Sequence, residues 1–278
     1  MNSKSKNIKP SVFAKAFTFS SALTILFSVV LTFSSCTEEE EIVAVVPSPE
    51  YARVQVIHNS ADLAAATVDV YLNDALLLDN FEFRTSSPFI DAPANEEIKI
   101  TIAGPNSTSS SQAIADFYYT LAASETYVLI AEGIVSTSGY SPATAFSIAV
   151  YAMGQETANN PLNTDLLVHH GCTDAPTVDV VEVGVGAGTI VDNASYGDFT
   201  AYLELATNDY TLDIRDETGA VTVASYSAPL QTLGLNGAAA VVVASGFLNP
   251  ANNSNGSGFG LYVALPSGGN LVALPAAK

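Results

Sequence analysis

The sequence contains no tryptophan and only two cysteines, Cys36 and Cys172, among its 278 residues. It therefore lacks the tryptophan packed on a disulfide that marks the core of antibody domains. If the sulfur of Cys36 is modified, no disulfide is possible and Cys172 is a lone thiol, which we interpret as a small buried apolar residue. The roughly 240 residues that follow Cys36 can bury a stable core without a disulfide.

Basic side chains are scarce, because the chain has 9 lysines and arginines against 28 aspartates and glutamates. Four of the basic residues and none of the acidic ones precede residue 36, so the remaining chain carries a formal net charge of −23. Such a surface repels phosphate backbones and excludes nucleic acid as a partner. It also resists anionic lipid headgroups, whereas divalent cations or cationic partners are natural counter-charges.

The N-terminal segment has the order of a secretory signal peptide. Lysines at positions 4, 6, 9 and 15 precede the apolar run 16–33, and two serines lead into Cys36. This layout resembles the signal of bacterial lipoproteins, although Phe33 stands where that family prefers leucine. The resemblance implies that residues 1–35 are removed and that Cys36 is lipidated, which anchors the protein to a membrane. The alternative, an uncleaved anchor helix, is disfavoured because the run is slightly short and contains serine and threonine.

We predict that residues 36–50 form an acidic tether. The four glutamates Glu38–Glu41 repel one another, and Pro47 and Pro49 also favour an extended path. CTEEEE resembles the acidic export tag of lipoproteins in one Gram-negative phylum. The resemblance implies an outer-membrane lipoprotein of the cell envelope that faces the cell exterior. The alternative is a charged spacer that only holds the protein away from the bilayer.

The rest of the chain is a tandem duplication with an offset near 112 residues. RVQVIHNSAD (53–62) aligns with DLLVHHGCTD (165–174), and TYVLIAEGI (126–134) aligns with AAVVVASGF (239–247). The matched polar residues include His58 with His170, Asp62 with Asp174, and Asp69 with Asp179. We predict two domains, 51–155 and 163–278, and the polar stretch 154–165 has the composition of a linker.

Within each copy the apolar residues have the period of strands. RVQVIH (53–58) and EEIKITI (96–102) alternate between apolar and polar residues, and turn formers recur about every ten residues. AAAVVVAS (238–245) is apolar throughout, as expected of a strand covered on both faces or very deeply buried. We predict an all-β chain with two tandem immunoglobulin-like Greek-key β-sandwich domains, and a small β-barrel is the alternative.

The opening of each copy resembles the bacterial domain of unknown function 4397, whose members begin V-R-V-x-H-A-S-P-D-A-P-x-V-D-V-Y-x-N-G. The first copy reads ARVQVIHNSADLAAATVDVYLND, with Asn59, Ala61 and Asp74 departing from that pattern. The second reads LLVHHGCTDAPTVDVVEVG, with Val181 in place of the tyrosine. The resemblance covers both copies. It implies an exported, repeat-forming β-domain and brings no established activity or catalytic residue.

Both copies carry residue types of a nucleophile–base–acid site: His58, Ser60 and Asp62; His170, Cys172 and Asp174. A hydrolase would need the imidazole beside the nucleophile and the acid orienting the ring. However, neighbouring strand residues face opposite ways, and a catalytic site is seldom needed twice. We favour histidines that end the first strand and bond backbone, and aspartates that shape the following turn. We predict no catalysis and a repeat-matched structural motif: His58, Asp62, Asp69, His170, Asp174 and Asp179.

Metal and phosphate sites are also disfavoured. Six aspartates offer oxygen ligands for Ca²⁺, but they form no closely spaced set: Asp62, Asp69, Asp79, Asp174, Asp179 and Asp192. The three histidines and the free cysteine lack zinc spacing. The glycines of GVGAGT (184–189) are typical of a phosphate loop, but β-branched residues follow them instead of a helix. We predict a turn there, with no metal and no cofactor.

Loops rich in serine, asparagine and glycine, 104–112 and 249–260, accompany several tyrosines. Such surfaces suit carbohydrate or protein recognition, and the alternative is flexible loops with tyrosines in the core. The sequence therefore predicts a surface-anchored, non-catalytic module for binding, adhesion or envelope structure. One alternative is an accessory glycan-binding protein for polysaccharide uptake, which would show a coplanar pair of exposed tyrosines. A hydrolase is the other.

Overall fold

The computed structural model describes residues 50–277, so Cys36 and the signal peptide predicted for residues 1–35 lie outside the described residues. The described part is built from strands and turns, with three short 3₁₀ helices: η1 (Leu63–Ala65), η2 (Ser110–Gln112) and η3 (Pro250–Asn252). Within this part of the chain, no helix is long and apolar enough to span a membrane.

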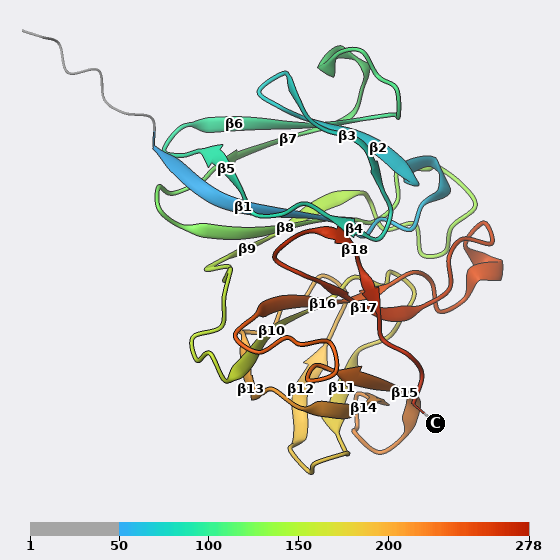
Figure 1. Ribbon diagram of the computed structural model, residues 1–278. Coiled ribbons are helices and arrows are strands. Elements are labelled where there is room, and N and C mark those ends of the chain that lie inside the picture. Colours follow the sequence, from blue (N-terminus) through green and yellow to red (C-terminus); the bar gives the residue numbers. More distant parts are fainter. Residues whose placement is uncertain (1–49, 278) are drawn as a thin grey trace, which may run out of the picture. The chain divides into compact units, whose positions relative to one another are not determined.

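The first repeat is a sandwich of two sheets (Figure 1). One sheet contains β1 (Tyr51–His58), β4 (Thr85–Ser86), β5 (Ile90–Pro93), β8 (Thr126–Glu132) and β9 (Ser147–Ala152). The other has the order β3-β2-β6-β7, with β2 (Thr67–Leu72), β3 (Ala75–Glu82), β6 (Glu97–Ala103) and β7 (Ala113–Thr120). The chain crosses between the sheets from β1 to β2, from β3 to β4, from β5 to β6 and from β7 to β8.

The second repeat has the same construction. One sheet contains β10 (Asn163–His170), β13 (Leu203–Ala206), β16 (Ala239–Ser245), β17 (Gly260–Ala264) and β19 (Val272–Ala273). The other contains β11 (Val178–Glu182), β12 (Gly188–Ala194), β14 (Asp209–Asp216) and β15 (Thr222–Pro229). In both repeats the first strand pairs in parallel with a late strand, β1 with β8 and β10 with β16. The predicted pair of β-sandwiches is confirmed, and the barrel alternative is wrong because the sheets of each repeat stay separate.

Three apolar cores hold these sheets. One fills the first sandwich and includes Val54, Val70, Ile100 and Leu129. Another fills the second sandwich and includes Leu166, Val180, Leu212 and Val242. The third lies between the repeats and combines residues of both: Ile57, Phe89, Val128, Ile130, Leu167, Val241, Val243, Ala264 and Leu271. Each fully buried aliphatic side chain stabilises the fold by about 1.5–3 kcal/mol, so this shared core makes a large contribution.

The repeats pack against each other through equivalent sheets. Val128 and Ile130 of β8 occupy the positions that Val241 and Val243 occupy in β16, and all four lie in the shared core. This explains the unbroken apolar run of β16, whose seven residues are all buried. Its alternate side chains enter the second sandwich core and the shared core, so the strand is covered on both faces. All described residues belong to one compact unit.

Polar contacts also cross between the repeats. The buried ring of His169 on β10 lies with Nε2 2.7 Å from Oε2 of Glu132 on β8. The Arg84 guanidinium donates to Ser245 Oγ at 3.0 Å and to the carbonyl oxygen of Gly258 at 2.8 Å. It also lies 3.9 Å from the centre of the Tyr262 ring. These bonds fix the relative position of the two sheets more specifically than apolar packing does.

A short strand from the end of the chain returns to the first repeat. Strand β18 (Gly269–Asn270) pairs antiparallel with β4, and Gly269 lies opposite Ser86. Gly269 has a φ of +100° and Gly268 a φ of +72°, and a Cβ on Gly268 would lie 2.4 Å from the Pro88 nitrogen. Glycine is therefore required for the chain to pass this close to the first repeat.

Candidate functional site

The histidines of the repeat-matched motif end β1 and β10 and bond backbone. Nε2 of His58 lies 2.7 Å from the carbonyl oxygen of Ala65, and Nε2 of His170 lies 3.2 Å from that of Pro176. A carbonyl oxygen only accepts, so Nε2 carries the proton and Nδ1 of the neutral ring is bare. Burial lowers the pKa of His58 to about 4, and burial also lowers the pKa of His170. Neither ring is charged at neutral pH.

The candidate nucleophiles are buried. The Oγ of Ser60 donates to the carbonyl oxygen of Gly133 at 2.7 Å, and Ser60 is fully inaccessible to solvent. Cys172 is equally inaccessible, and its Sγ donates to Asp174 at 3.3 Å. Burial raises the pKa of this thiol to about 12, so it is not a thiolate at neutral pH. The structure brings neither residue into hydrogen-bonding contact with the histidine of its own repeat.

Asp62 holds the loop that follows β8, and Asp174 holds the equivalent loop that follows β16. Asp62 accepts from the backbone amides of Val135 and Ser136 at 2.8 and 2.7 Å, and from Ala64 at 2.9 Å. Burial alone would raise its pKa, but hydrogen bonds from Ala64 and Ser136 bring it below the ordinary value. The aspartates were expected to shape the turn that follows them, and Asp62 does so through Ala64. Its other bonds reach a loop far along the chain.

The second repeat uses Asp174 in the same way. Its carboxylate accepts from the amides of Leu248 and Asn249, both at 2.7 Å, and from Nδ2 of Asn253 at 2.9 Å. Leu248 follows β16 as Val135 follows β8. The matched aspartates therefore perform one architectural task in both copies, with the long-range loop as the main partner.

Asp69 and Asp179 hold a β-bulge. They accept from the amides of Asn80 and Asn193 at 2.8 and 2.7 Å, where φ is +51° and +53°. The pairing register shifts beside both residues, in β2–β3 and in β11–β12. Asparagine tolerates this left-handed conformation, which accounts for the matched Asp-Asn pairs in the sequence. Among residues 50–277, no group of three or more His, Cys, Asp or Glu side chains is placed to hold a metal ion.

Glu182 occupies an anion-binding loop that the sequence analysis missed. The glycine run 184–188 is the turn between β11 and β12, and Gly186 and Gly188 have φ of +83° and +77°. Its backbone amides surround the Glu182 carboxylate, with distances of 2.7 Å from Gly184 and 2.9 Å from Gly186. Burial alone would raise the pKa of Glu182, but these bonds lower it. The loop does cradle an anion, which is a side chain of the same hairpin.

We expect Glu182→Gln to lower the free energy of unfolding by about 3 kcal/mol at pH 7, because charged hydrogen bonds are lost in a buried setting. Urea denaturation followed by circular dichroism measures this. Glu217→Gln removes the same charge from an exposed side chain and should change stability by less than about 0.5 kcal/mol. Equal effects of the two substitutions would contradict a stabilising role for the Glu182 carboxylate in the glycine loop.

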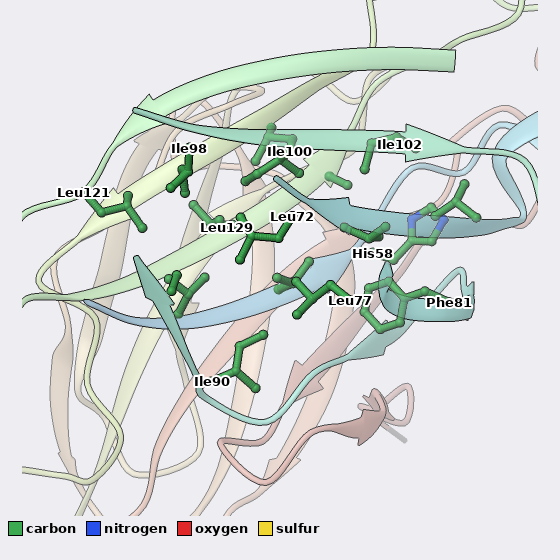
Figure 2. Close-up of a pocket in the computed structure, with 17 residues that line it drawn as sticks. His58, Leu72, Leu77, Phe81, Ile90, Ile98, Ile100, Ile102, Leu121 and Leu129 are labelled. Carbon is green, nitrogen blue, oxygen red and sulfur yellow. The ribbon is translucent and has the colours of Figure 1, made fainter. Parts of the chain in front are cut away.

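A cavity of about 30 Å³ lies inside the first sandwich, with His58 at one end and apolar side chains such as Leu77, Ile100 and Leu129 around it (Figure 2). The ring of His58 stacks on that of Phe81, with the ring centres 5.9 Å apart. The volume is far below the ~150 Å³ of cavities that admit benzene. A similar void of about 40 Å³ lies beside His170 in the second sandwich. These voids are packing features of the repeat and do not form a preformed ligand site.

The buried neutral state of His58 predicts acid sensitivity. Between pH 6.5 and about 4 the unfolded chain binds a proton at His58 that the folded protein does not, so stability falls as pH decreases. The total loss is about 3 kcal/mol. His58→Gln keeps a donor for Ala65 and cannot titrate, so its stability should depend less on pH over that range. Urea midpoints at several pH values test this, and identical pH profiles would refute it.

An open groove of about 340 Å³ lies along the edge of the first sandwich, between β3 and the paired strands β4 and β18. Its lining combines apolar surface with small polar side chains and two carboxylates: Leu78, Asp79, Asn80, Phe81, Glu82, Thr85, Ser86, Ser87, Pro88, Gly269 and Asn270. The volume lies in the range of sites for small molecules or single side chains. No sequence pattern predicted this groove.

Comparison with family models gives a match over residues 52–160 and 164–253, to the domain of unknown function DUF4397. The chain belongs to this family. The match comprises two tandem copies, which confirms the duplication and the resemblance drawn from the opening motifs. The copies meet at the polar stretch 154–165, and the C-terminal strands β17 to β19 lie beyond the second match.

Other comparisons add no functional argument. Among curated proteins, no sequence matches this chain. Among solved structures, the chain is similar to one described as "Alpha-glucan binding by a streptococcal virulence factor". The identity is 8%, the likeness covers 69% of this chain and 92% of that chain, and the TM-score is 0.21. At that TM-score the likeness carries no argument about fold or ligand.

Proposed function

We propose that this DUF4397 protein is a lipid-anchored, non-catalytic binding and structural module of the cell envelope, exposed on the outer surface. One observation carries the non-catalytic part. The matched polar residues use their hydrogen-bonding groups on the protein's own backbone, as Asp62 does with the loop after β8. Residues used in this way serve architecture and are not available to a substrate.

The burial of the candidate nucleophiles supports the same proposal against a hydrolase. Such an enzyme would need an accessible serine or thiol beside a histidine that titrates near neutral pH. Ser60 and Cys172 are inaccessible, and the pKa of His58 is about 4. The acidic surface further supports a partner that is not nucleic acid.

The tyrosines favour a protein ligand over a polysaccharide. Tyr118 is 58% exposed, but Tyr140 packs on Phe247 and Tyr202 meets Tyr151 edge-on at 72°. Among the described residues, Tyr151 and Tyr202 form the one tyrosine–tyrosine ring contact, and its edge-on geometry is not the coplanar arrangement of a glycan platform. The most exposed tyrosines, Tyr118 and Tyr51, form no ring contact with each other.

Mass spectrometry of the mature N-terminus tests the anchor. We expect a diacylglyceryl group on the sulfur of Cys36, and we expect Cys36→Ala to move the protein out of the membrane fraction. An unmodified thiol, or a Cys36→Ala variant that stays membrane-bound, would contradict the anchor. Protease treatment of intact cells tests the outer face, and complete resistance of a protein that is digested after lysis would contradict it.

A further inference from the structure

The groove between β3 and β18 contains several polar side chains that are unengaged, although Thr85 donates to the carbonyl oxygen of Glu82 and Ser87 accepts from the amide of Val56. Among the described residues, no side-chain hydrogen bond involves the side chains of Asn80, Glu82 or Asn270, and the hydroxyl of Ser86 has no partner. Ser86 is only 4% exposed and lines the groove. Ten buried side-chain polar atoms of the described residues lack a partner, and the Ser86 hydroxyl is the one among them that belongs to this groove. A ligand group in the groove would complete its bonding.

The groove is composite and depends on the duplication. Most of its lining comes from the first repeat, and Gly269 and Asn270 come from the C-terminal strand that follows the second. The second repeat has Phe199 at the position of Ser86, since Phe199 pairs with His169 as Ser86 pairs with Ile57. Phe199 packs on His169 at 4.2 Å, whereas the small Ser86 accommodates β18 and the groove.

The charge of the groove selects its ligand. Asp79 and Glu82 line it as exposed carboxylates, and no basic residue lines it. The nearest arginine in sequence, Arg84, is engaged elsewhere with Ser245 and Gly258. Covering two carboxylates with a neutral ligand would desolvate them without compensation, whereas a cation restores a favourable interaction. An anionic ligand is repelled.

The flanking strands select an extended chain. β3 is the end strand of its sheet and β18 is the end strand of the other, so each presents backbone groups that no neighbouring strand pairs. Extended peptides bind by adding to such edges. We propose that this groove binds an extended basic segment of a partner protein, with a lysine or arginine side chain between Asp79 and Glu82. This inference rests on the proposed binding function and assigns it a location and a ligand class.

Fluorescence anisotropy with the purified full-length protein tests the proposal. The probe is a fluorescein-labelled peptide of alternating lysine and threonine, compared with a glutamine–threonine peptide, a glutamate–threonine peptide and a neutral malto-oligosaccharide as competitor. We expect the basic peptide alone to bind, more weakly at higher salt. Glu82→Gln and Asp79→Asn should each raise its Kd about fivefold or more, because each removes one charge from the contact.

Matched variants separate the groove from the general acidity of the surface. Asp192→Asn alters the counterpart of Asp79 in the second repeat, and Glu217→Gln removes an exposed charge elsewhere; neither should change Kd. Ser86→Ala should weaken binding without lowering stability, since the hydroxyl has no partner to lose. Absence of basic-peptide binding, equal weakening by the control variants, or preferential binding of the oligosaccharide would each overturn the proposal. The lipid anchor at Cys36 is tested separately by mass spectrometry, so failure of the groove proposal can be distinguished from failure of the proposed anchoring.

Discussion

His169→Ala is expected to lower the free energy of unfolding by about 3–5 kcal/mol, because it leaves the Glu132 carboxylate buried without its partner. The two side chains are 0% and 4% exposed and lie 2.7 Å apart across the contact between the repeats. The ring also packs on Phe199 at 4.2 Å, so part of the loss comes from packing. Urea denaturation at pH 7 measures the change.

The double variant His169→Leu with Glu132→Leu is the control. Replacing a buried pair by apolar residues of similar size is often neutral or stabilising, so the double variant should be far more stable than His169→Ala. At the matched positions of the other repeat the chain has Ile57 and Ser245, so the repeat as such does not require a charged pair there. A loss below about 1 kcal/mol for His169→Ala would contradict the role of the pair.

Asp62→Ala is expected to cost about 3–4 kcal/mol at pH 7, because the amides of Val135 and Ser136 lose a charged acceptor. The folded pKa of Asp62 lies below its unfolded value. Its contribution is therefore present above an unfolded pKa of about 4 and is lost as pH falls through the lower folded pKa. The difference between wild type and variant should shrink at acidic pH.

Glu82→Ala is the comparison for Asp62→Ala, because Glu82 is an exposed carboxylate on β3 whose side chain makes no hydrogen bond within the described residues. It should change stability by no more than about 0.5 kcal/mol. Thermal and urea unfolding of both variants distinguish carboxylates that hold the fold from those that line the groove. Similar losses for the two variants would remove that distinction.

The sandwiches were predictable because strand periodicity and the tandem duplication can both be read directly from the sequence. The alternation in RVQVIH correctly indicated a strand, but its polar Gln55 is buried as well, because β1 is covered on both faces. The unbroken apolar run of β16 does report burial on both faces. The role of the glycine run was partly predictable, because a turn was expected there. The available signal for the bound carboxylate was Glu182, which lies two positions before Gly184. The carboxylate of Glu182 was not predicted in this loop because the glycine motif was compared only with phosphate-binding loops.

The contacts between repeats were not predictable from one sequence. His169 and Glu132 are 37 residues apart and lie on different sheets, so no periodicity connects them. The groove depends on β18 returning to β4 from the far end of the chain. Such long-range pairing is set by packing of whole sheets, which local propensity does not encode.

Differential scanning calorimetry of the full-length protein tests most directly whether the two family copies form a single cooperative unit. A shared core, the buried His169–Glu132 pair and the β4–β18 pairing join the copies. The account predicts one transition whose calorimetric and van't Hoff enthalpies agree. Two separate transitions, or unfolding of one copy while the other keeps its strands, would contradict it.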